Sequence, residues 1–243
     1  MELFLDLDRR RVLLSLSAIG ATGLISSLLS GCGAKPIVSG LRRSSGDVFI
    51  NGEAVSADNI KKRSAAVLVA PDATVSTGKS GSAVFVVGKD AFLLRKNSRL
   101  TLVPNKKTAL TKKIGEELPQ ISGFKLHSGA LMSVFSPGVR KLRTPTAQIG
   151  VRGTGVYIEA SADKSYICTC YGLVKIDALD GEKNSEIVKT IHHDSPRIIH
   201  GLTGIIEKAP MVNHKDAELV LLESLVGRKP PFVGALGMVS ESY

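Results

Sequence analysis

Two cysteines and a pair of histidines are the residues of this chain whose types and spacing favour metal chemistry. Cys168 and Cys170 lie two residues apart in the stretch YICTCYG. Alternate residues of a β-strand point to the same face, so both thiols would face the same way. Two thiolates with one or two imidazoles can hold a tetrahedral zinc ion or a soft copper ion. The candidate metal ligands are therefore Cys168, Cys170, His192 and His193.

The spacing of these residues leaves three interpretations open. Structural zinc sites usually place two to four residues between their cysteines, whereas a single residue separates Cys168 from Cys170. His192 and His193 would diverge on extended backbone, so only one of them could join a given metal. Alternate residues of a strand lie about 7 Å apart, which is the limit for a disulfide. Two buried or redox-capable free thiols are the third interpretation.

Catalysis has little support in the sequence. Ser195 directly follows His192-His193-Asp194, but a nucleophile, a base and an acid must converge in space, which adjacency does not supply. The chain has no nucleophile elbow and no HExxH motif. Before Gly78-Lys79-Ser80, Ala73 stands where a phosphate-binding loop needs glycine. We therefore expect that the protein is not an enzyme.

The N-terminal residues have the pattern of an export signal. Arg9-Arg10-Arg11 precede the uncharged apolar segment 12–29, as a basic n-region precedes an h-region. Leu29-Ser30-Gly31-Cys32 resembles a bacterial lipobox, and the stretch DRRRVLL is similar to a twin-arginine signal. We expect residues 1–31 to be a signal peptide and Cys32 to be lipidated. An uncleaved transmembrane anchor is the alternative, since the apolar segment is long enough to span a bilayer.

Lipidation of Cys32 predicts a location on the periplasmic side of the cell envelope. Two or three acyl chains hold a protein firmly at a membrane. Gly33, rather than an aspartate, follows the cysteine, which favours the outer membrane in a Gram-negative cell. Residues 33–46 are small, polar and basic, and predict a tether between the lipid and the folded domain.

The charge of the chain predicts a surface that attracts anions. Its 32 lysines and arginines outnumber its 22 acids, which gives a net charge of +10. Export argues against nucleic acid as a partner, and the aromatic content of 5% offers few stacking surfaces. An envelope protein, an anionic lipid surface or an anionic polymer is the expected partner. The basic clusters are 61–63, 106–107, 112–113 and 140–143.

The pattern of the exported part predicts an all-β domain that ends in a helix. From Asp47 onward, short β-branched runs alternate with Gly, Asp and Asn about every eight to twelve residues. The run 82–87, SAVFVV, is apolar on both faces and should be buried on both. Residues 104–123 break this rhythm and predict a loop or a short surface helix. A helix at about 214–226, capped by Asn213, should pack on the β-domain.

A set of short motifs resembles a FecR domain. The resemblance covers roughly residues 46–178 and implies an all-β, solenoid-like or roll-like domain in the periplasm. It divides the exported chain into a β-domain, 47–178, and a C-terminal extension, 179–243. The motifs are TPTAQIGVRGTGVYIEA (144–160), Gly46-Asp47-Val48, the stretch 76–83 and Ser128-Gly129-Ala130-Leu131.

Arg152 is a candidate contact residue within the longest of these motifs. Its guanidinium could present a fork to an anionic ligand or to a carboxylate of a partner. The alternative is an internal role, in which the same fork satisfies carbonyls at strand ends.

The resemblance also bears on function. Signalling FecR-type proteins carry a cytoplasmic region that engages a sigma factor, but only about eleven residues precede the apolar segment here. We therefore expect an exported, membrane-anchored binding or scaffolding module rather than a sigma-factor regulator in cis. The alternatives are a metal-binding envelope protein that uses the cysteine and histidine cluster, and an envelope sensor that acts through a partner.

Overall fold

The apolar runs of the sequence form an all-β fold, as predicted. The computed structural model describes residues 39–55, 67–106, 120–181 and 183–233, all within one compact unit, Pro36–Tyr243. The predicted signal peptide and Cys32 lie outside the described residues. None of the helices in the described ranges has the length and apolar character needed to cross a membrane.

The strands are β1 (Gly40–Ser45), β2 (Val48–Ile50), β3 (Glu53–Ala54), β4 (Thr74–Thr77), β5 (Ser82–Val87), β6 (Asp90–Leu94), β7 (Arg99–Pro104), β8 (Ile121–Val134), β9 (Val139–Arg143), β10 (Ala147–Ala160), β11 (Lys164–Ala178), β12 (Ser185–Thr190), β13 (Arg197–His200) and β14 (Ile206–Lys208). The helix α3 (Asp216–Leu225) and the short 3₁₀ helix η1 (Pro231–Val233) follow.

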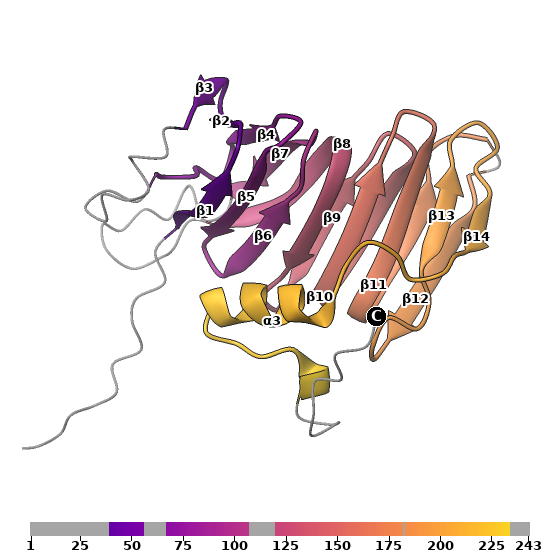
Figure 1. Cartoon of the computed structure of the whole chain (residues 1–243). Coiled ribbons are helices and arrows are strands. Elements are labelled where there is room, and N and C mark those ends of the chain that lie inside the picture. The colour runs from indigo at the N-terminus through magenta and orange to yellow at the C-terminus, as the bar shows by residue number, and fades with distance from the viewer. Residues whose placement is uncertain (1–38, 56–66, 107–119, 182, 234–243) are drawn as a thin grey trace, which may run out of the picture. The chain divides into compact units, whose positions relative to one another are not determined.

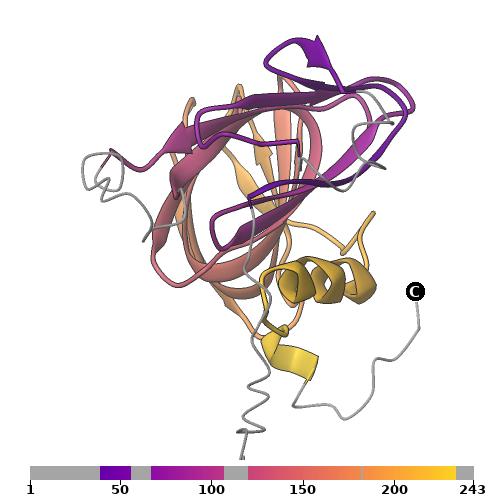
Figure 2. The ribbon, with the colours of Figure 1, turned by 90° about the vertical axis from the view of Figure 1, so that its left-hand side faces the viewer.

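These strands form one open sheet that rolls over on itself into two layers (Figures 1 and 2). Three long strands, β8, β10 and β11, bend and contribute one half to each layer. We call one layer the covered layer; it runs in the order β14-β13-β11-β10-β8-β6-β5-β1. The other is the open layer, β12-β11-β10-β9-β8-β7-β4-β2-β3.

Glycines permit the bends of the long strands. Gly129 in β8 has φ +87°, and a Cβ added there would lie 2.5 Å from the Cα atom of Ser98. Gly172 in β11 has φ +96°. Residues that carry a side chain rarely adopt this backbone conformation, so glycine lets each strand turn from one layer into the other.

The main hydrophobic core lies between the two layers. Its centre contains a group of packed aromatic rings, in which Phe85 and Phe92 stack with their centroids 4.9 Å apart. Phe124 and Phe135 each meet the ring of Phe92 edge-on, with centroids 6.3 and 6.1 Å away. The predicted burial of 82–87 on both faces is confirmed, since Phe85, Val86 and Val87 are fully buried. Phe85 and Val87 face this core, whereas Val86 faces a second one.

The second core lies on the outer face of the covered layer, beneath the C-terminal segment (Figure 2). Leu219, Leu222 and Val226 of this segment are buried there against Met132 and Tyr157. The predicted helix and its packing on the β-domain are confirmed. Its N-cap is Lys215 rather than Asn213, because Glu218 accepts a hydrogen bond from the backbone N–H of Lys215 at 3.0 Å. The residues of both cores, within the part of the chain that the structure describes, all belong to the compact unit Pro36–Tyr243.

Some predicted boundaries differ from the structure. Residues 40–45 are not part of a tether, because they form β1 and pair with β5, with Leu41 buried. The β-structure also continues beyond residue 178, since β12 and β13 both pair with β11. Short polar strands such as β1 and β12 carry little hydrophobic periodicity, and their partners lie far away or across a turn. Of the predicted loop or short surface helix 104–123, residues 107–119 lie outside the described ranges; at its two ends the prediction is wrong, because Pro104 belongs to β7 and 121–123 to β8.

Candidate metal centre

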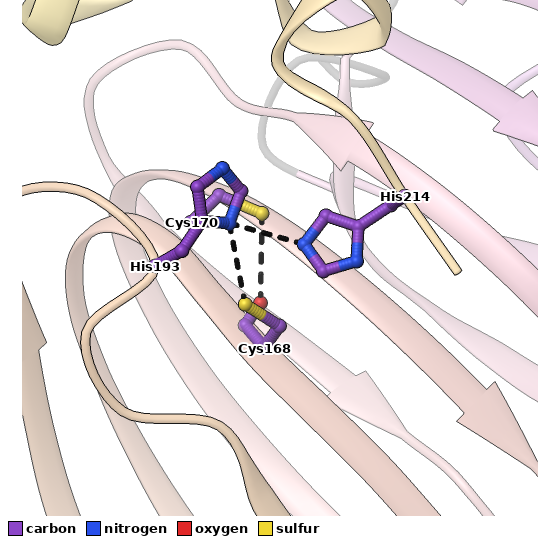
Figure 3. A group of neighbouring side chains, drawn as sticks. All are labelled: Cys168, Cys170, His193 and His214. Carbon is purple, nitrogen blue, oxygen red and sulfur yellow. Dashed lines mark hydrogen bonds between the residues drawn. The ribbon is translucent and has the colours of Figure 1, made fainter. Parts of the chain in front are cut away.

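Four side chains from three segments meet in the second core (Figure 3). Cys168 and Cys170 come from β11, His193 from the loop between β12 and β13, and His214 from the segment before α3. All four are buried, and one ligand atom of each lies within 4.8 Å of the others. The Nδ1 atom of His193 is 3.4 Å from the Cys168 sulfur and 3.0 Å from Nε2 of His214.

The alternation of β11 presents both thiols on one face, as the sequence predicts. Tyr166, Cys168 and Cys170 face the second core, whereas Ile167 faces the main core. His193 adopts φ +50°, and its backbone N–H donates to the carbonyl of Cys170 at 3.0 Å. This bond holds the loop against the strand and directs the imidazole toward the sulfurs.

A backbone carbonyl and an aromatic ring orient the imidazole of His214. The Nδ1 atom lies 2.7 Å from the carbonyl oxygen of Val212. A carbonyl only accepts hydrogen bonds, so Nδ1 carries a proton and donates it. In the neutral ring, Nε2 is then a lone pair that faces the cluster. The ring also stacks on Tyr157, with centroids 4.5 Å apart.

A carboxylate orients the imidazole of His193 in the same sense. Nε2 of His193 lies 2.8 Å from an oxygen of Asp216, in the first turn of α3. Because an ionised carboxylate only accepts, Nε2 donates and Nδ1 of the neutral ring is a lone pair. Two lone pairs therefore face each other across 3.0 Å beside a sulfur. Such an arrangement needs a cation between them, either a proton or a metal ion.

The close approach of these thiols and imidazoles shifts their pKa values. The Cys170 thiol, followed by the imidazoles of His193 and His214, holds the pKa of Cys168 below its usual value. Burial, followed by the neighbouring Cys168, raises the pKa of Cys170. Burial alone would lower the pKa of His193, but Cys168 and Asp216 outweigh it and the net pKa is raised. In the metal-free protein, the lowered pKa of Cys168 and the raised pKa of His193 both favour a thiolate beside a protonated imidazole.

The structure brings together three of the four predicted ligands and adds another. Cys168, Cys170 and His193 meet, and both cysteines are free thiols. His192 does not belong to this group; its Nε2 lies 2.8 Å from Asp216 and its ring packs 4.5 Å from Phe232. The added residue, His214, has no neighbouring motif in the sequence, and only the return of the C-terminal segment brings it to β11.

Arg152 lies elsewhere, on the outer face of the open layer. Its register partners are Val139 of β9 and Leu173 of β11, and its side chain is exposed. Its guanidinium makes no hydrogen bond or ion pair with any residue in the described ranges. An internal role at strand ends therefore has no acceptor there.

The four atoms offer a complete ligand set for one tetrahedral ion. Two sulfurs and two imidazole nitrogens match structural zinc sites, in which the protein supplies all four ligands. Both imidazoles already donate their other N–H, to Asp216 and to the carbonyl of Val212. Such outer hydrogen bonds are typical of metal-bound histidines. With four protein ligands, no position stays open for a reactive water, so the arrangement favours structure over hydrolysis.

No family model matches this chain, and no curated protein matches it. Two crystal structures, both described as those of a "putative anti-sigma factor from Parabacteroides distasonis ATCC 8503", are similar to it at 12% and 14% sequence identity. Their TM-scores are 0.44 and 0.45, and each match covers 62% of this chain. The matches span 64% of those chains, less than two thirds of their length.

Proposed function

We propose that this chain is an exported, membrane-anchored envelope module whose β-domain binds a metal ion through Cys168, Cys170, His193 and His214. One observation carries the metal proposal. The lone pairs of His193 Nδ1 and His214 Nε2 face each other across 3.0 Å, beside the Cys168 sulfur. Their orientation is fixed from outside by Asp216 and by the carbonyl of Val212.

Zinc is the ion that fits this ligand set best. Zn²⁺ accepts two thiolates and two imidazoles in a tetrahedron without a preference for another geometry. Cu⁺ also accepts soft sulfur ligands and is the second choice.

The role of the ion in this proposal is to scaffold a binding module. It would join β11, the loop after β12 and the segment before α3, which are distant in sequence. Structural zinc ions contribute directly to folding free energy in this way. The module is not an enzyme in this proposal, because the ligand set leaves no open coordination position.

The sequence supports the envelope location and the FecR-like character of the module. The basic and apolar segments before Cys32 have the order of an export signal, and the lipobox-like tetrapeptide ends at this cysteine. The FecR-like motifs lie within an all-β domain. Relay of an envelope signal through a separate partner stays an alternative role for the same module.

Metal analysis of residues 36–243 tests the metal proposal. The protein is purified under reducing conditions, and zinc and copper are measured by mass spectrometry against protein concentration. We expect about one zinc ion per chain in the wild type and none in the double variant Cys168→Ser, Cys170→Ser. The matched control is His200→Ala, since His200 pairs with Glu207 outside the cluster. Absence of both metals from the wild type would overturn the proposal.

A further inference from the structure

The outer face of the open layer gathers cations from strands that are distant in sequence. Directly paired residues of neighbouring strands point to the same face. Arg152 pairs with Val139 and Leu173. Lys141 and Lys175 both pair with Gly150, from its two sides. Arg143 pairs with Gln148 on one side and with Lys125 on the other. We call this surface the basic face; its cations are Arg99, Lys125, Lys141, Arg143, Arg152, Lys175 and Lys189.

Acids hardly neutralise this surface. Across the described residues of β7 to β12, Asp177 is the acid that points the same way, and it pairs with Lys175 at 2.7 Å. The other six cations make no ion pair within the described ranges. His127 lies on the same face, and its pKa is lowered by burial and by Arg99 and Lys125. The basic face therefore carries a concentrated positive potential.

Aliphatic side chains lie among these cations. Val139 and Ile187 are each 65% exposed, and Leu173 is 39% exposed. They come from β9, β12 and β11, so they are spread across the basic face. No Phe or Tyr side chain of the described residues of β7 to β12 points outward here. Sugar-binding and base-binding surfaces rely on aromatic stacking, whereas cations mixed with aliphatic groups suit the boundary between lipid headgroups and acyl chains.

We propose that the basic face binds the surface of an anionic phospholipid bilayer. Its lysines and arginines would contact the headgroup phosphates, while Val139, Leu173 and Ile187 would enter the boundary below them. The metal centre plays no part in this contact, because its side chains lie on the covered layer. The inference is thus independent of the metal proposal.

Vesicle sedimentation of residues 36–243 tests this inference without the acyl anchor. The probes are vesicles of phosphatidylcholine alone and of phosphatidylcholine mixed with phosphatidylglycerol. We expect binding only to the phosphatidylglycerol vesicles, with a steep loss as salt rises. The triple variant Lys141→Gln, Arg143→Gln, Arg152→Gln should bind about a hundredfold more weakly, because each removed cation weakens binding about fivefold.

The matched control removes the same charge elsewhere. It carries Lys89→Gln, Lys96→Gln and Lys164→Gln, at exposed positions outside the basic face, and it should bind as the wild type does. Thermal melting verifies that all variants fold. Equal losses in both triple variants would overturn the inference, because net charge alone would then explain binding. Binding to soluble polygalacturonate but not to the vesicles would overturn it as well, in favour of an acidic polysaccharide.

Discussion

At the scale of single residues, Asp216 determines which ring nitrogen of His193 is available to a metal ion. It holds Nε2 of His193 and also contacts Nε2 of His192, at 2.8 Å each. Burial would raise the pKa of Asp216, but these two imidazoles outweigh it and the net pKa is lowered. The carboxylate therefore stays ionised and keeps Nδ1 of His193 available to a metal.

Asp216→Asn should weaken zinc binding while all four ligands remain. An amide is a poorer acceptor than a carboxylate and no longer fixes the tautomer of His193. We expect a loss of about 10- to 100-fold in affinity, measured by competition with a chromophoric chelator. Asp194→Asn is the control, since its carboxylate accepts hydrogen bonds from two backbone N–H groups, those of Ile191 and His192. Equal affinities for the wild type and Asp216→Asn would contradict this role.

Zinc affinity should fall as pH falls through the raised pKa of His193. In the metal-free protein this imidazole holds its proton to higher pH than usual, and the raised pKa of Cys170 keeps a second proton in place. A metal ion must displace both protons. Each displaced proton costs about tenfold in affinity per pH unit. Chelator competition between pH 8 and pH 6, as rough limits, measures this slope. A pH-independent affinity would contradict the assigned protonation states.

The sequence predicts part of the centre and not the rest. Strand alternation places Cys168 and Cys170 on one face, and their contact with His193 requires only a short hairpin. His214 lies 44 residues after Cys170, and no local pattern shows that its segment returns to β11. His192 and His193 are equivalent in a sequence pattern, and the positive φ of His193 selects between them.

At the scale of elements, the C-terminal segment is attached to the covered layer by two kinds of contact. Leu219, Leu222 and Val226 pack into the second core. Glu223 is buried, accepts a hydrogen bond from Tyr171, and pairs with Arg228 at 2.6 Å. The metal centre lies at the other end of this segment, at His214. The ion would therefore attach the start of the segment to the covered layer, while the packing of α3 attaches its middle.

Removal of the metal should loosen this segment before the main core. We expect chelation to increase amide hydrogen exchange in 209–233, and to leave the strands around Phe85 and Phe124 protected. Exchange measured by mass spectrometry, with and without a chelator, gives the comparison. Cys168→Ser, Cys170→Ser should exchange like the chelated wild type and not respond to chelator. A uniform increase over all strands would contradict a local role of the ion.

The hydrophobic pattern of the sequence predicts which strands and helices form better than it predicts where they begin and end. SAVFVV and the helix after His214 have strong apolar patterns, and both form as predicted. β1 and β12 are short and polar, so only their pairing with β5 and β11 identifies them. The bends at Gly129 and Gly172 divide the long strands between the two layers. No hydrophobic periodicity in the sequence marks these positions.

At the scale of the whole molecule, charge is organised by strand register and not by clusters in the sequence. The basic stretch 140–143 divides between two faces. Lys141 and Arg143 point outward, whereas Arg140 is buried and pairs with Asp90 at 3.1 Å. Arg152 and Lys175 join the outward pair from other strands. The positive charge of the chain is visible in its composition, but the basic face exists only in the folded sheet.

The proposed anchor makes a separate prediction about the chain that includes residues 1–35. Cells that express it in the presence of radiolabelled palmitate should yield a labelled protein in the membrane fraction. Cys32→Ser should lose the label, because the acyl chains are attached through this sulfur. Cys168→Ser is the control for a different cysteine and should keep the label. An unlabelled wild-type protein in the cytosol would contradict both the anchor and the envelope location.

X-ray absorption at the zinc edge tests the proposed metal centre, because it reports the atoms around the ion. We expect two sulfurs at about 2.3 Å and two imidazole nitrogens at about 2.0 to 2.1 Å from the zinc in purified residues 36–243. His214→Ala should lose one of the two imidazole contributions. A zinc ion surrounded only by oxygen and nitrogen, or a spectrum unchanged in His214→Ala, would contradict it.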